Sequence, residues 1–64
     1  MSAPHVYGRV VLLTDIYAEG SWIYAGTIAQ VEKRYGDGGL DLMVRQGDCE
    51  LLFWAWESEV RPCE

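Results

Sequence analysis

The sequence predicts an all-β chain, and three features of its 64 residues support this. Two apolar runs, 40–44 and 51–56, are separated by the polar segment 45–48 with Gly47 inside it, which is the pattern of a β-hairpin. Apolar and polar residues alternate strictly along 40–45, with the period of a strand that has one buried face. Seven glycines are spread along the chain, which suits several tight turns.

A first strand is expected over residues 6–16. Its centre is the run of Val and Leu at 10–13, and such residues favour extended backbone. By alternation Val10 and Leu12 share one face of the strand, so residues 11 and 13 share the other. Both faces are therefore apolar, and we expect the strand to be covered on both sides or to meet a partner on its outer face. Residues 1–6 carry no pattern and are expected to form a loose N-terminal tail.

A second strand is expected over residues 27–35, after a connecting loop over 15–25. Strict alternation would place Ile28 and Val31 on opposite faces of this strand. A β-bulge near 29–30 would turn both side chains inward, and we expect a bulge there. A helix in this segment is disfavoured because the apolar residues show no 3.6-residue period.

The rest of the chain predicts a second hairpin and a short closing strand. The segment Gly-Asp-Gly-Gly at 36–39 supplies the positive-φ positions that a hairpin turn needs. Two strands are then expected over 40–45 and 50–54. A turn of 3-10 helix is expected over 55–59, and a last strand over 60–63. In the third strand the inward residues should be Leu40, Leu42 and Val44. Pro62 cannot donate a ladder hydrogen bond, so the last strand should lie at a sheet edge.

The order of these signals resembles that of the small SH3-like barrels. The matching parts are residues 8–13, a long loop, 25–31, the Gly turn, the 40–54 hairpin and 56–60. In that superfamily a Gly-Thr-x-x-x-Val element opens the second strand, and a 3-10 turn bearing acidic residues leads into the last. The resemblance implies an all-β, five-stranded SH3-like barrel with a short 3-10 turn before the last strand, formed by residues 1–64 as one domain.

Members of this superfamily serve as RNA-binding modules, protein-docking modules, accessory subunits and, rarely, enzymes. The nucleic-acid-binding members are basic, whereas this chain is acidic. The acidic first loop and paired Trp of proline-peptide-binding SH3 domains are missing here. The segment 51–54 also lacks the Gln and Tyr that line the pore of the tetrameric plasmid-type dihydrofolate reductase. The resemblance therefore implies a fold and leaves the function open.

The charge balance excludes some partners. Ten acidic residues oppose five basic ones, so the net charge of −5 repels phosphate backbones and anionic membranes. No apolar run approaches the roughly 20 residues that span a bilayer. The first residues show neither a charged nor an apolar region typical of a secretory signal, which predicts a cytoplasmic protein.

The residues with reactive side chains do not form a recognisable catalytic or metal-binding pattern. His5 is the only histidine, and its spacing from Cys49 and Cys63 does not resemble a zinc site. Both cysteines are expected to be free thiols. The acidic pairs 48/50 and 57/59 are interpreted as solvated charges at turns. We therefore predict no catalytic residue, no metal and no cofactor.

Aromatic residues provide the strongest functional signal. The chain has more of them than a barrel of this size can bury, and exposed aromatic patches mark interaction sites. The candidate interaction residues are Tyr17, Trp22, Tyr24, Phe53, Trp54 and Trp56.

Three functional hypotheses follow. The favoured one is a non-catalytic protein-interaction module or small accessory subunit that docks on a protein partner or self-associates as a homo-oligomer. The second is a single-stranded nucleic-acid-binding regulator, whose aromatic rings would stack on bases while Arg9, Lys33, Arg34, Arg45 and Arg61 gather on one face. The third is an oligomeric ligand binder or enzyme with a pocket between subunits.

The net negative charge of the chain predicts that it does not bind nucleic acid. An electrophoretic mobility shift assay at low salt, with mixed single-stranded RNA and DNA, should show no shifted band at micromolar protein, because an acidic chain lacks the basic footprint that binding requires. A shift that fades as salt is raised would instead favour the nucleic-acid hypothesis.

Overall fold

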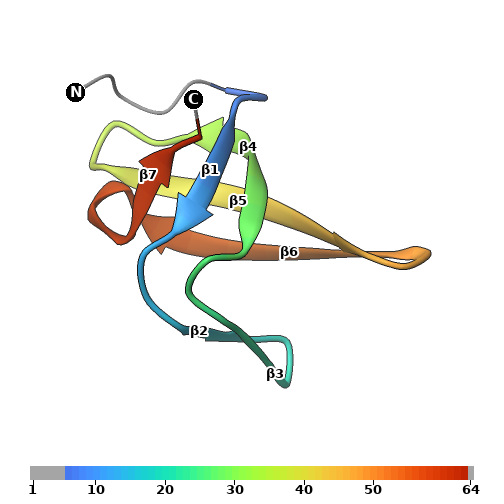
Figure 1. Ribbon diagram of the computed structural model, residues 1–64. Coiled ribbons are helices and arrows are strands. Elements are labelled where there is room, and N and C mark those ends of the chain that lie inside the picture. The colour runs from blue at the N-terminus through green and yellow to red at the C-terminus, as the bar shows by residue number, and fades with distance from the viewer. Residues whose placement is uncertain (1–5, 64) are drawn as a thin grey trace.

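The computed structural model describes residues 6–63 of the chain. The expected N-terminal tail lies outside the described residues except for Val6, which is exposed in a turn. Seven strands and one 3-10 turn make up the described part (Figure 1): β1 (Arg9–Leu12), β2 (Ile16–Ala18), β3 (Ser21–Ile23), β4 (Ile28–Arg34), β5 (Gly39–Gln46), β6 (Cys49–Trp56), η1 (Glu57–Glu59) and β7 (Val60–Pro62). Residues 6–63 contain no α-helix, and none of their elements is a helix that could cross a membrane. The all-β prediction is confirmed.

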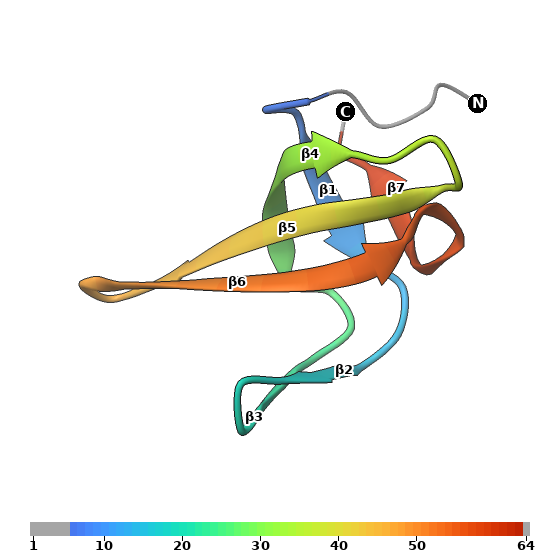
Figure 2. The same cartoon turned by 180° about the vertical axis from the view of Figure 1, so that it is seen from behind.

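Two antiparallel sheets contain these strands. The larger sheet has the order β6-β5-β4-β1-β7, and β2 pairs with β3 in a separate hairpin. In Figure 1 β1 lies in front of β5, and in Figure 2 it lies behind, with β1 and β4 running across the direction of β5 and β6. The larger sheet therefore curls into two layers, and its inward face encloses the core.

The core consists of apolar side chains from all strands except β2, as alternation along each strand requires. Its members are Val10, Leu12, Ile23, Ala29, Val31, Leu40, Leu42, Val44, Phe53, Ala55 and Val60. Ile23 joins it from the β2–β3 hairpin, and Ile16 and Ala18 pack against it. The hairpin is thus attached to the large sheet by its apolar side.

The β5–β6 hairpin matches the sequence prediction closely. The strands pair in continuous register from Gln46 and Cys49 at the turn to Gly39 and Trp56 at the far end. The three residues expected to point inward from β5 are all buried. The turn contains Gly47 with a φ of 61°, a conformation that glycine adopts at little cost.

The prediction of a β-bulge near 29–30 is wrong. Ala29 and Val31 are both buried, while Ile28 is 51% exposed, so β4 alternates regularly there. The pairing shows why: Val10 faces inward and opposes Ala29, which places Ile28 beside Val11 on the outward side. The irregularity in β4 occurs further on, between Val31 and Lys33, where the strand pairs with β5.

The connecting loop expected over 15–25 contains a small β-hairpin instead. β2 and β3 pair with Tyr17 opposite Trp22. Glu19 and Gly20 between them have φ of 53° and 75°, and positive φ at both positions is the hallmark of a tight hairpin turn. Glutamate rarely adopts this conformation, so the sequence carries only half of the turn signal.

The end of the chain follows the prediction with shifted bounds. The 3-10 turn occupies only residues 57–59 of the expected 55–59, because β6 continues to Trp56. The Oε1 of Glu59 accepts a hydrogen bond from the backbone N–H of Trp56, 2.9 Å away, which closes the turn. β7 is an edge strand, as the position of Pro62 predicted.

Two leucines test the assignment of the faces. Leu42→Ala should lower the free energy of unfolding by about 2–5 kcal/mol, because a fully buried side chain leaves a cavity. Leu52→Ala, at a position 59% exposed, should change it by only about 0.5 kcal/mol. Urea unfolding followed by circular dichroism measures both, and equal losses would contradict the described faces.

Gly39 provides a second test. A Cβ atom at this position would overlap the indole ring of Trp54. Gly39→Ala should displace the ring, shift the tryptophan emission and cost about 1 kcal/mol, the low end for overpacking because the ring can turn outward. Gly36→Ala is the matched control, since its Cβ meets nothing within 4 Å. Unchanged emission in the Gly39 variant would show that the ring does not lie over the glycine.

Candidate interaction surface

The outward side of β4, β5 and β6, called here the outer face, carries a line of large apolar side chains. Leu52, Trp54 and Trp56 of β6 are 59%, 42% and 45% exposed. The two indole rings meet edge to face, with centroids 4.4 Å apart and an interplanar angle of 79°. Because residues 51, 53 and 55 point inward, strand alternation directs these three side chains to solvent together.

The six predicted interaction residues do not form one surface. Trp54 and Trp56 lie on the outer face, whereas Phe53 is 7% exposed and belongs to the core. The remaining three, Tyr17, Trp22 and Tyr24, belong to the β2–β3 hairpin and the residue after it, and all three are exposed. Figures 1 and 2 show this hairpin projecting away from the large sheet.

The hairpin aromatics form a cluster of their own. The Tyr17 and Trp22 rings pack edge to face with centroids 5.3 Å apart. Since Ile23 and Ile16 point into the core, alternation turns Tyr17 and Trp22 to the opposite, solvent side of the hairpin. The contact between these two rings joins β2 to β3, and cross-strand aromatic pairs of this kind stabilise a hairpin.

A depression on the outer face carries negative charge. Its volume is about 310 Å³, and its lining residues are Glu32, Asp41, Leu52, Phe53 and Trp54. The Tyr35 hydroxyl donates to Asp41 Oδ2 at 2.7 Å, and this bond raises the pKa of the Tyr35 phenol above its ordinary value. Within residues 6–63 neither carboxylate of this depression forms an ion pair. We call it the acidic depression.

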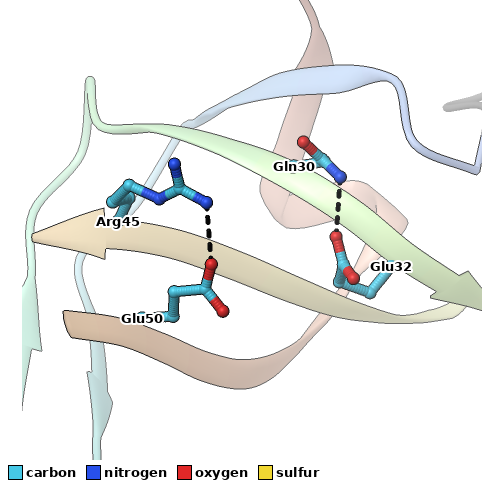
Figure 3. Close-up of polar contacts among 4 residues, drawn as sticks. All are labelled: Gln30, Glu32, Arg45 and Glu50. Carbon is cyan, nitrogen blue, oxygen red and sulfur yellow. Dashed lines mark hydrogen bonds and ion pairs between the residues drawn. The ribbon is translucent and has the colours of Figure 1, made fainter. Parts of the chain in front are cut away.

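A second depression carries positive charge. Its volume is about 400 Å³, and its lining residues are Arg9, Ile28, Ala29, Gln30, Met43 and Arg45. Figure 3 shows Arg45 of β5 reaching Glu50 of β6, with Nη2 2.7 Å from Oε2. The same figure shows Gln30 Nε2 donating to Glu32 Oε2 along β4, at 2.8 Å. We call this the basic depression.

The five cations do not gather in one free cluster. Arg9 and Arg45 meet at the basic depression, but Arg34 is 3.6 Å from Glu57, and Lys33 lies over the Tyr35 ring with Nζ 5.0 Å from its centroid. The basic surface that the nucleic-acid hypothesis requires is therefore divided between separate contacts.

Candidate catalytic groups are sparse over residues 6–63. No three His, Cys, Asp or Glu side chains in this range are placed to hold a metal ion. Cys49 and Cys63 are free and exposed, and His5 lies outside the described residues.

Sequence reasoning missed the two depressions, although part of the signal was present. Because Leu40, Leu42 and Val44 were expected to point inward, alternation places Asp41, Met43 and Arg45 on the outward side of β5, where they lie. Their neighbour Ile28 was expected inside because of the bulge that does not occur. A correct assignment of that residue would have indicated a broad outer face with apolar and charged groups side by side.

Comparison of the chain with models of protein families found no match, and comparisons with curated proteins and with solved structures found none either. The geometry of the outer face is therefore the evidence for function.

Proposed function

We propose that this protein is a non-catalytic interaction module that docks on another protein surface through its outer face. The observation that carries the proposal is the set of three neighbouring, half-exposed apolar side chains, Leu52, Trp54 and Trp56, on one strand. Tryptophan is the residue most enriched at the energetic centres of interfaces, because it buries a large area with little loss of side-chain freedom.

The proposal includes an SH3-like barrel as the finer description of the fold. Supporting it are the strand order β6-β5-β4-β1-β7, the hairpin inserted between β1 and β4, and the 3-10 turn directly before β7. The long connection between β1 and β4 and the 3-10 turn correspond to features on which the sequence resemblance was based. Protein docking is among the roles this superfamily fills.

Small size also favours association. A chain of 64 residues buries only about 60% of the surface that its unfolded form exposes, so its stability is limited. Oligomerisation or docking is one of the usual ways in which such chains gain further burial. Covering the indole rings would remove apolar area from water, which stabilises a complex by about 25 cal/mol for each Å² buried.

A pair of matched tryptophan variants tests the proposal. Trp54→Ser should abolish association, whether with other copies or with another protein retained on immobilised chain, because it removes the centre of the apolar line. Trp22→Ser is the control, since it removes a tryptophan of the hairpin that is more exposed than Trp54, at 54% against 42%. Sedimentation velocity and affinity retention measure both kinds of association, and circular dichroism verifies folding.

Two results would overturn the proposal. One is a wild-type chain that remains monomeric and retains no protein. The other is a Trp54→Ser variant that associates like the wild type while Trp22→Ser does not, which would move the interaction to the hairpin.

A further inference from the structure

We propose that the surface docked on the outer face is that of a second copy of this chain, placed so that the acidic depression of each copy lies against the basic depression of the other. This inference rests on the proposed function and goes further by naming the partner. It follows from the arrangement of charge on one face.

The two depressions are neighbours along the same strands. On β5, Asp41 lines the acidic depression and Arg45 lines the basic one. Four residues of extended strand separate them, which is roughly 13 Å. On β4, Glu32 and Ile28 are related in the same way, and the paired residues Gln30 and Met43 lie midway.

This arrangement is self-complementary under two-fold symmetry. A two-fold axis that lies in the plane of the face and crosses the strands at the Gln30–Met43 pair turns one copy over onto the other. The operation lays β5 antiparallel over β5 of the second copy, so each Asp41 comes against an Arg45 and each Arg45 against an Asp41. Arg9 pairs with Gln30, so it lies at the level of the axis and opposes no carboxylate of the other copy. Such an interface uses one patch twice, as in most homodimers.

The charges needed for this contact are available. Over residues 6–63, Asp41 forms no ion pair. Arg45 forms one, with Glu50, at an exposed site where such pairs contribute little. A guanidinium has five N–H donors, so Arg45 can keep this bond and still donate to a second carboxylate.

Apolar side chains occupy the space between the charges. Ile28, Leu52 and Trp54 are exposed on the outer face, and Met43, which lines the basic depression, is partly buried on β5 between Asp41 and Arg45. An apolar centre with charged groups around it is the usual anatomy of a protein interface. The net charge of −5 on each copy opposes association. At physiological salt this repulsion is screened beyond about 8 Å. The attraction within the facing pairs is screened less, because their charges are in contact.

Other occupants fit the face less well. A basic peptide would neutralise the acidic depression and leave Arg9 and Arg45 uncovered. An anionic ligand would do the reverse. A second copy brings an opposite charge to Asp41 and to Arg45 at once, which is the reason for preferring it.

Charge-reversal variants test this arrangement, measured by sedimentation equilibrium from 1 μM to 1 mM. The wild-type chain should dimerise. Asp41→Lys alone places a lysine against each Arg45, and Arg45→Glu alone places a glutamate against each Asp41, so each should weaken its own dimer at least tenfold. An equimolar mixture of the two variants should restore dimerisation, because every contact then joins opposite charges.

The controls separate geometry from net charge. The mixed pair carries the same total charge as two wild-type copies, so its recovery cannot arise from net charge. Asp48→Lys makes the same charge change as Asp41→Lys at the tip of the β5–β6 hairpin, and it should dimerise at least as well as the wild type. Circular dichroism and urea unfolding verify that each variant is folded.

The inference is overturned if the wild type stays monomeric to 1 mM, if the single variants dimerise as the wild type does, or if their mixture fails to recover. A monomer that still retains another protein in a Trp54-dependent way would remove the second copy as partner and leave the proposed function standing. A monomer that retains nothing would remove both.

Discussion

The register of the β5–β6 hairpin is the constraint on which the rest of the structure depends. Eight residue pairs align without interruption from the turn at Gly47 to the far end. Because side chains alternate with a period of two, a slip of one residue would exchange the inward and outward sets of both strands. The fully buried Leu40 and Leu42 prevent that slip, since it would expose them to water. The same register turns Trp54 and Trp56 outward.

Gly39 links the packing of the hairpin to the candidate surface. Because it has no side chain, the indole of Trp54 lies over its backbone and stays only partly exposed. The ring therefore has a defined position on the outer face, held from below by Gly39 and from the side by Trp56. A preorganised aromatic group loses little conformational freedom on binding, which favours its use as an anchor.

The outer face also differs from the hairpin aromatics in what surrounds it. Tyr17 and Trp22 pack on each other and on a small two-stranded element. Trp54 instead borders Glu32 and Asp41, and the basic depression with Arg9 and Arg45 follows along the same strands. Apolar area combined with both signs of charge can discriminate between partners, whereas apolar area alone cannot.

The sequence predicted the five strands of the large sheet, the turns between β4, β5 and β6, and the faces within most strands, since alternation and turn chemistry are local. It therefore predicted the inward residues of β5, the 3-10 turn and the edge position of Pro62. It missed the β2–β3 hairpin, which lies where a loop was expected. Only the tertiary structure decided which side of β4 faces the core, because that depends on pairing with β1, and so Ile28 was misplaced. It also decided that Phe53 is buried, and that Arg9, Glu32 and Arg45 share a face. Those residues belong to β1, β4 and β5, and their proximity depends on how these strands pair, which no local pattern records.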